Sequence, residues 1–546
     1  MFEHDVDPVF GSLALSAVAA ALPILLLFLL LGVFKVRAPF AAIAALGLSI
    51  VLAIVGWNMP PVQALSAATA GVFYGLFPIL WILVNALWVY RLTVVTPWCE
   101  VFGRTIRSVS DDLRILSILI AFCFGALLES LAGFGAPVAI SAAMLLAAGM
   151  APLKAALVSL LANTAPVAFG ALAAPVVALA GVTGLPLNDL ASMAGRQTPF
   201  IAVLVPLILV FLVDGLRGLR QTWPVALVAG LVFGVAQFIT SNFFVVALTD
   251  VVAAVATIVA VLLMLRVWQP VELVGISGAV SAEAVSGTML AEAPAIARPP
   301  LREVLMSVAP YVIIMAVFSV AQIPAFKDWL AVFGTVSFAW PGLDVVTAAG
   351  EPAGAQIMHV DTLGATGTLL LLSGLLTVAL YRIVPRTAVA AYGATLHQLR
   401  WTIVTVTAVL GLSFVMNLSG QATSLGVALA SAGGFFVVLS PLIGWIGVAL
   451  TGSDTSSNVL FGPVQVAAAE QVGLPPVLMA AANSSAGVLG KMLSVQNLAV
   501  AAAAVGMVGS EGTMLRKLLP WSLGLLALIT VLIVMQSTPV LGWMVP

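Results

Sequence analysis

The sequence predicts an all-α polytopic membrane protein, an inverted repeat with two re-entrant hairpins and two broken transmembrane helices. The first observation behind this prediction is composition: 62% of the 546 residues are hydrophobic and 8% are charged, whereas globular domains carry about 25% charged residues. The second is the length of the apolar runs. The third is a set of polar, Gly-rich interruptions that recur in the same order in both halves of the chain.

Apolar runs long enough for helical spans occur along the whole chain. A spanning helix needs about 20 apolar residues, and the run LALSAVAAALPILLLFLLLGVF has that length. Long runs with scattered Gly and Pro favour a helical bundle over a barrel, whose strands are short and alternating. Twelve spans are expected, at residues 12–34, 38–57, 62–90, 152–181, 190–213, 222–240, 244–265, 303–321, 363–381, 400–418, 474–508 and 519–540.

Residues 113–150 and 435–471 differ from the other apolar segments because each is interrupted in its middle by a polar tip. The halves on either side of the tip are too short to cross a bilayer comfortably. Irregular backbone at membrane depth survives only where it is buried in protein or lines a wet cavity. We therefore expect two re-entrant hairpins.

The loop charges predict the orientation. Basic residues gather in alternate loops, whereas the N-terminus MFEHDVDP and the loop at 322–362 are acidic. The positive-inside rule then places both termini outside. The segment 268–300, rich in Ala, Gly, Ser and Pro, is expected to be a cytoplasmic linker.

The two halves match element by element. Each has two spans, a third span, a short surface stretch, a hairpin, a broken span and a closing span. The first repeat covers 1–215 and the second 303–546, with two linking spans and the linker at 216–302. The third span runs inward in the first half and outward in the second. This arrangement is an inverted repeat, whose substrate site is expected at the midplane between the repeats.

Four polar stretches, ESLAGFGAP, ANTAP, TGSDTSSN and ANSSAG, are each expected to break a helix. Pro137 and Pro166 fall where a new half-helix begins, and such starts present free N–H groups and a positive dipole end to an anion. The alternative is that these small residues only pack helices together. The predicted substrate-binding residues are Gly133, Phe134, Gly135, Asn163, Thr164, Ser453, Asp454, Thr455, Ser456, Asn458, Asn483, Ser484, Ser485 and Lys491.

Ionisable residues deep in a membrane are functional candidates. Glu129 ends the first hairpin arm, where burial and a helix C-terminus both disfavour its charged form. It is predicted to carry a proton; the alternative is a neutral carboxyl that only ties down the hairpin tip. Asp454, at the second tip, is assigned equally to proton coupling and to capping the next helix.

Three further charged residues lie in or near the apolar segments. Lys491 lies one helical turn from Gly487, where it is placed to meet a substrate carboxylate, to replace a coupling sodium as a fixed charge, to pair with Asp454, or to extend to the inner membrane surface. Arg196 is a candidate either for a substrate carboxylate or for a structural contact with Asp189. Asp250 is expected near the outer surface.

Several function classes are disfavoured by the sequence. A net charge of -1 predicts no nucleic-acid partner, and Cys99 and Cys123 predict neither a metal site nor a disulfide framework. No nucleophile–base pair, phosphate-binding loop or metal-ligand spacing is evident. An intramembrane enzyme is therefore a remote alternative, and a channel fits matched breaks less well than alternating access.

The long motifs GALLESLAGFGAPVAI, LLANTAPVAFGA, GRQTP, LTGSDTSSNVLFG and AANSSAGVLGKMLSVQNLAVAAAAVG resemble the L-lactate permease family of the ion transporter superfamily. The resemblance covers nearly the whole chain. It implies a secondary active transporter of the cell (inner, cytoplasmic) membrane that imports L- or D-lactate and glycolate with protons. It further implies elevator-type movement, a homodimer, the bilayer as surroundings and no cofactor apart from the coupling proton.

One departure from the superfamily pattern bears on the coupling ion. ANT and ANS stand where several relatives have Ser-Asn-Thr, so the first hydroxyl of each motif is missing. Sodium coordination as in those relatives is thereby placed in doubt. A sodium-coupled carboxylate transporter, or a cation/proton antiporter on the same scaffold, is the alternative function.

Overall fold

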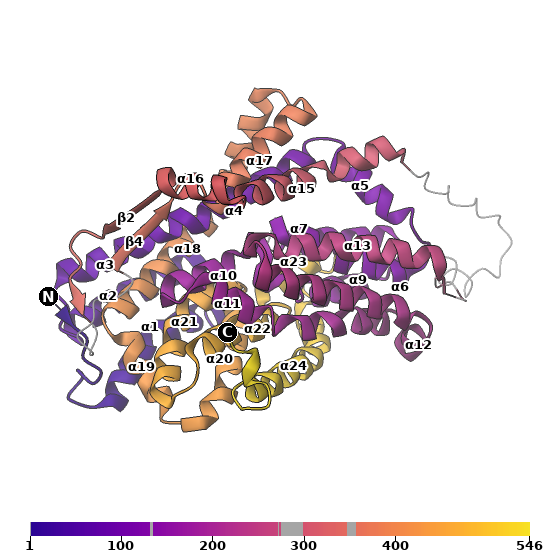
Figure 1. Cartoon of the computed structure of the whole chain (residues 1–546). Coiled ribbons are helices and arrows are strands. Elements are labelled where there is room, and N and C mark those ends of the chain that lie inside the picture. Colours follow the sequence, from indigo (N-terminus) through magenta and orange to yellow (C-terminus); the bar gives the residue numbers. More distant parts are fainter. Residues whose placement is uncertain (1, 132–134, 271, 273, 275–298, 347–355) are drawn as a thin grey trace.

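The computed structural model describes the chain apart from residues 1, 132–134, 271, 273, 275–298 and 347–355. Helices make up nearly all of it (Figure 1), so the predicted all-α class is confirmed. In the described residues, eleven helical stretches are long and apolar enough to cross a membrane, or twelve if one bent pair counts as a span. Gly133, Phe134 and most of the predicted linker at 268–300 lie outside the described residues.

The first repeat begins with three helical spans. The third is bent where Pro78 interrupts it and Phe77 leaves the helical conformation, because proline removes a backbone donor and clashes with the preceding turn. An amphipathic helix follows on the surface. These elements are α1 (Leu13–Gly32), α2 (Ala38–Val55), α3 (Pro61–Tyr74), η1 (Gly75–Leu80), α4 (Trp81–Val94) and α5 (Trp98–Arg107).

The first hairpin and the broken helix come next. The hairpin's first arm is 19 residues long and apolar enough to span a membrane, so the expectation that each half is too short was wrong for this arm. The helix after the hairpin bends by 61° at its break. The elements are α6 (Leu113–Leu116), η2 (Ser117–Phe124), α7 (Gly125–Leu131), α8 (Ala136–Ala147), α9 (Pro152–Ala162), η3 (Val167–Phe169) and α10 (Gly170–Thr183).

Two predicted spans, 190–213 and 222–240, correspond to two helical arms, labelled together as α12, that are joined by a sharp reversal. The reversal occurs at Asp214 and Gly215, and Gly215 has a φ of 63°, a conformation that glycine adopts without steric cost. The elements here are α11 (Leu187–Ala194), α12 (Thr198–Phe243), η4 (Val246–Leu248) and α13 (Thr249–Val267).

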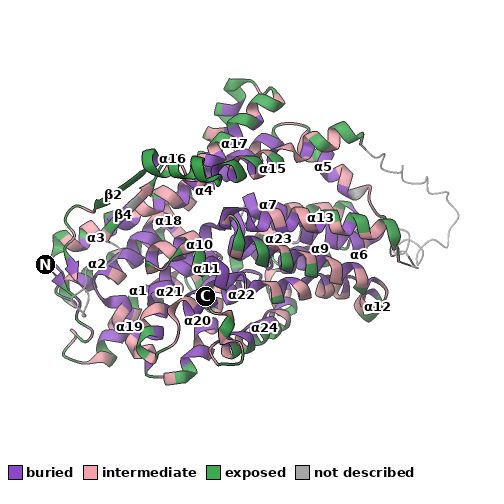
Figure 2. Ribbon diagram, viewed as in Figure 1, coloured by how far each residue is buried: buried purple, intermediate pink, exposed green. Residues whose placement is uncertain are grey.

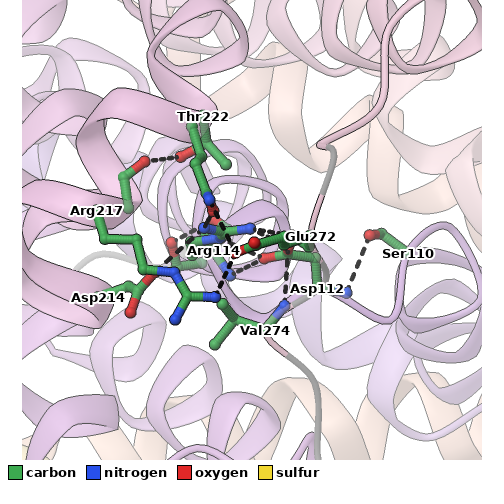
Figure 3. Close-up of polar contacts among 11 residues, drawn as sticks. Ser110, Asp112, Arg114, Asp214, Arg217, Thr222, Glu272 and Val274 are labelled. Carbon is green, nitrogen blue, oxygen red and sulfur yellow. Dashed lines mark hydrogen bonds and ion pairs between the residues drawn. The ribbon is translucent and has the colours of Figure 1, made fainter. Parts of the chain in front are cut away.

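A buried arginine fixes this reversal to the base of the first hairpin (Figure 3). Arg114 is fully buried, and its guanidinium bonds Asp112 Oδ2 at 2.7 Å and Asp214 Oδ2 at 3.1 Å. It also donates to Gln221 Oε1 at 2.6 Å and to the Glu272 carbonyl at 2.6 Å. Guanidinium suits such a site because its five donors are held in a rigid fork.

The second half of the chain has three helices, α15 (Leu301–Ala321), α17 (Thr366–Tyr381) and α18 (Pro385–Leu418), before its hairpin. A short helix then precedes the second hairpin, a helix with a late break, and a closing span. The inverted repeat stays a prediction. The other elements of this half are α16 (Pro324–Gly334), α19 (Gln421–Ala430), η6 (Gly433–Phe435), α20 (Phe436–Thr451), α21 (Asp454–Val472), α22 (Pro476–Lys491), α23 (Val495–Ala504), α24 (Glu511–Gln536) and η7 (Gly542–Met544).

Short strands join the N-terminus to the long loop of the second repeat. β2 (Thr335–Ala339) pairs antiparallel with β4 (Ile357–Asp361), and β1 (Phe2–Glu3) pairs parallel with β3 (Val345–Val346). The N-terminus therefore lies beside this loop (Figure 1), on the same side, as the loop charges predict.

The core consists of two main hydrophobic clusters, here called the hairpin cluster and the scaffold cluster. The hairpin cluster includes the first hairpin, α9, α12, α13, α22 and α24. The scaffold cluster includes α1, α2, α3 and the inner face of α18. Burial differs sharply between individual spans: 94% of the span at 113–131 is buried but only 33% of α1 (Figure 2). Because apolar side chains all around a helix require an apolar neighbour on every face, α1 faces lipid and the hairpin arm faces protein.

Candidate substrate and coupling site

A buried ion pair joins the two repeats. Glu129 lies on α7 in the first hairpin, and Lys491 is the last residue of α22. Lys491 Nζ lies 2.6 Å from Glu129 Oε1, and the two side chains are only 7% and 3% exposed. The pairing with Asp454 that the sequence left open for Lys491 is not the one found. Since an isolated buried charge is costly, each residue sustains the charge of the other.

The first break supplies the second partner of Glu129. Asn163 ends α9, and its Nδ2 donates to Glu129 Oε2 at 2.9 Å. The helix cannot continue beyond this point because Pro166 lacks an N–H and its ring clashes with the preceding turn. Gly170 then passes so close that an added Cβ would lie 3.1 Å from Glu129 Oε1.

A left-handed turn follows the first break. Ala171, Leu172 and Ala173 have φ values of 45°, 52° and 63°, in a region that costs non-glycine residues about 1 kcal/mol each. Such strain persists only where surrounding contacts enforce it, and it gathers at functional sites. Here the turn places the Ala171 backbone against the cavity described below.

The second hairpin holds its carboxylate with neutral partners. Asp454 Oδ2 accepts from Ser484 Oγ at 2.6 Å and from Asn458 Nδ2 at 3.3 Å, while Oδ1 has no partner. Ser453, not Asp454, caps α21, since its Oγ accepts from the backbone N–H of Ser456. The capping role considered for Asp454 was therefore wrong.

Asn483 lies inside an unbroken helix. α22 continues through Asn483, Ser484 and Ser485 to Lys491, and the break comes at 492–494. The prediction that ANSSAG breaks the helix was wrong, because this stretch has no proline comparable to Pro166.

A side-chain network takes the place of a break at this point. Asn483 Nδ2 donates to Asn458 Oδ1 at 2.9 Å, and Gln465 Nε2 donates to Asn483 Oδ1 at 3.2 Å. Sequence reasoning missed Gln465, and a polar residue within the apolar α21 was the available signal.

A small cavity of about 40 Å³ lies between the two clusters, with room for about three water molecules. One wall comes from the hairpin cluster and carries the charged pair; the opposite wall is apolar. Its lining comprises Ile79, Leu83, Glu129, Val167, Gly170, Ala171, Ala174, Pro175, Val406, Gly452, Ser453, Asp454, Thr455 and Lys491. The cavity thus joins a cation, two carboxyl groups and an apolar face.

The other predicted residues that the structure describes do not line this cavity. Thr164 Oγ1 donates to the Leu161 carbonyl, and Gly135 begins α8 beside Asn497. Ser485 Oγ has no partner. Asn497, which sequence reasoning missed, donates to the Lys491 carbonyl at 3.1 Å and so supports the end of α22.

Arg196 belongs to a separate structural contact. It donates to Asn242 Oδ1 at 2.8 Å and to the Met544 carbonyl at 2.7 Å. It ties the start of α12 to the C-terminal segment, and the expected partner Asp189 is not among these acceptors.

The whole chain is similar to one family of known proteins. The family model described as L-lactate permease matches residues 16–540. This chain belongs to the L-lactate permease family. It is 39% identical to the L-lactate permease of Bacillus subtilis strain 168, over 99% of each chain, and 39% identical to the glycolate permease GlcA of Escherichia coli K12, over 98% of each.

Membership in the L-lactate permease family, together with the apolar helices, identifies a multi-pass transporter of the cell membrane and not an enzyme. Among solved structures, the chain is similar to the YdaH transporter of Alcanivorax borkumensis, with a TM-score of 0.43 and 16% identity over 85% of this chain and 86% of that one.

Proposed function

We propose that the chain imports L- or D-lactate and glycolate, small 2-hydroxymonocarboxylates, together with protons. The permeases named for lactate and glycolate support the substrate class. The observation that carries the coupling is the buried contact of 2.6 Å between Lys491 and Glu129 beside the cavity. A cation held by a titratable carboxylate can exchange that carboxylate for the carboxylate of a substrate.

Competition for Lys491 couples the two ligands. While Glu129 is ionised, its negative charge occupies the ammonium group and repels a second anion. A proton on Glu129 removes that charge, and Lys491 is then free to bind the substrate carboxylate. The total charge of the site is the same before and after proton and anion bind together, so neither ligand binds well alone.

Moving a proton together with the anion also removes the cost of the membrane potential. An anion that entered alone against the field would have to overcome about 2.3 kcal/mol per 100 mV. A proton and a monoanion carried together are neutral. Ile79, Leu83 and Val406 on the apolar wall face the hydrocarbon part of a small 2-hydroxy acid.

Transport requires the cavity to open to each side in turn. The cavity is lined by residues of both hydrophobic clusters, and this position supports elevator-type movement of the unit formed by the two hairpins. A Thr455→Cys variant lacking Cys99 and Cys123 tests this. We expect lactate to change the rate at which a membrane-impermeant thiol reagent labels the introduced cysteine. The rate is expected to rise when the reagent is added on one side of the membrane and to fall when it is added on the other. The homodimer that the family resemblance implies stays a prediction.

Uptake of labelled L-lactate into proteoliposomes tests the function. A proton gradient alone is expected to drive accumulation, and unlabelled glycolate to compete. Accumulation driven only by a sodium gradient would contradict the proton mechanism and favour the sodium-coupled alternative. Absence of lactate exchange under every gradient would contradict the substrate assignment.

A further inference from the structure

Asp250 is a second buried carboxylate beside the first break. It lies in the first turn of α13 and is 1% exposed, so it is buried and not at the outer surface as the sequence led us to expect. Its Oδ1 accepts from Gln237 Nε2 at 3.1 Å, and its Oδ2 has no partner. Among the ion pairs of the described residues, none includes Asp250.

The free oxygen of Asp250 offers a place for a proton to bind. An unpaired buried carboxylate is costly, and a proton on Oδ2, which has no hydrogen-bond partner, removes that cost. Asp250 also lies in the first turn of α13, where the positive end of the helix dipole acts on its carboxyl group.

Gln237 connects Asp250 to the break that holds Asn163. The same Nε2 that donates to Asp250 also lies 3.3 Å from the Ala165 carbonyl, and Gln237 Oε1 accepts from Thr198 Oγ1 at 2.9 Å. Ala165 is two residues beyond Asn163, which donates to Glu129. A change of charge at Asp250 therefore acts on the segment that orients Asn163.

Glu129 is the one carboxylate on the neighbouring elements whose charge acts on Asp250. The elements packed against α13 are α7, α10, α12, η2 and η4. Their other titratable or charged groups are Cys123 on η2 and Asp214, Arg217 and Arg220 at the reversal of α12. Arg266 is at the far end of α13 itself. Of these groups, Glu129 is the one that also contacts Lys491, so a charge on Asp250 acts on the carboxylate that holds the cation.

We propose that Asp250 is a second proton-binding site of the transporter, coupled to Glu129 through Gln237 and the α9–α10 break. Its free Oδ2 takes a proton from water and returns it to water. While Asp250 is neutral, the ionised Glu129 is not repelled and holds Lys491. When Asp250 loses its proton, the repulsion favours protonation of Glu129 and release of Lys491 to substrate. This inference rests on the proposed proton symport.

The test compares wild-type protein with Asp250→Asn in proteoliposomes, by two measurements. One is exchange of labelled for unlabelled lactate without a gradient, and the other is lactate-driven proton entry, followed with an internal pH dye. Asparagine keeps the bond from Gln237 but binds no proton. Because asparagine mimics the neutral acid, Glu129 stays ionised and holds Lys491, so we expect lactate exchange at neutral pH to be reduced at least ten-fold. Proton entry per lactate transported is expected to stay within about two-fold of wild type, because Glu129 still carries the proton. Thr249→Ser, the adjacent buried position, is the control and is expected to match wild type.

Each outcome separates the two proposals. Lactate exchange without proton entry in the wild type would overturn the proton symport itself. Lactate exchange that stays at the wild-type level in Asp250→Asn would overturn only the role of Asp250. If Asp250→Asn also lowers the melting temperature, Gln237→Met decides, since it removes the connection and leaves the carboxylate. Wild-type exchange in Gln237→Met then overturns the inference, and a loss of exchange at the wild-type melting temperature supports it.

Discussion

The two hairpins carry one carboxylate each, and the two carboxylates are held in different ways. Glu129 in the first hairpin contacts a cation from the other repeat and an amide from a broken helix. Asp454 in the second contacts a hydroxyl and an amide, with one oxygen unbonded. The difference teaches that similar sequence patterns give a buried ion pair in one half and a carboxyl group with only uncharged hydrogen-bond partners in the other.

Among the variants that test this difference between the hairpins, Lys491→Met is expected to reduce lactate transport the most. Breaking a buried ion pair leaves an unpaired charge and costs about 3–5 kcal/mol, and the substrate loses its cation. Lactate transport is expected to fall more than 100-fold with a lower melting temperature. The double variant Glu129→Gln/Lys491→Met is expected to regain thermal stability but not transport. Lys154→Met, outside the cavity, is the matched control; transport within two-fold of wild type in Lys491→Met would remove the pair from the mechanism.

Glu129→Gln and Asp454→Asn together test whether only the first carboxylate carries a proton. Glutamine mimics the protonated acid and frees Lys491, so exchange is expected to continue while lactate-driven proton entry falls at least 30-fold. Asparagine still accepts from Ser484, so Asp454→Asn is expected to keep proton entry per lactate within about three-fold. Equal loss of coupling in both variants would show that the hairpins are equivalent after all.

Asn163→Ala and Asn483→Ala compare the broken helix with the continuous one. Each leaves buried partners unsatisfied, at about 1–3 kcal/mol, and we expect lactate affinity to fall about ten-fold in both. Only Asn163→Ala is expected to change the pH dependence of uptake, because Asn163 contacts Glu129. The measurement is a set of lactate binding isotherms at several pH values. Identical pH profiles for the two variants would contradict the expected difference between the broken and the continuous helix.

Ser485→Ala is expected to have the smallest effect. The Ser485 hydroxyl is buried without a partner, so its removal leaves no group unsatisfied, and the change is expected within about 0.5 kcal/mol of wild-type stability. Lactate affinity is expected to change less than two-fold. A clear loss of affinity would return Ser485 to the substrate contacts that the sequence predicts.

Local chemistry made the first hairpin and its break predictable. Pro166 dictates the end of α9, and a glutamate within an apolar arm marks a buried ionisable group. Asn483 was misplaced because Asn and Ser are compatible with either a break or a continuous helix, and only tertiary partners such as Gln465 decide. The contact between Glu129 and Lys491 joins positions 362 residues apart, so no local pattern records it. The volume of the cavity likewise depends on tertiary packing, so it could not be predicted from the sequence.

The arginine at the base of the first hairpin has a consequence for synthesis. Arg114 is made together with Asp112, but its partner at Glu272 follows 158 residues later. Translation at about 5–20 residues per second delays that contact by roughly 8–30 s. The base of the first hairpin therefore reaches its full set of contacts only after the middle of the protein has been made.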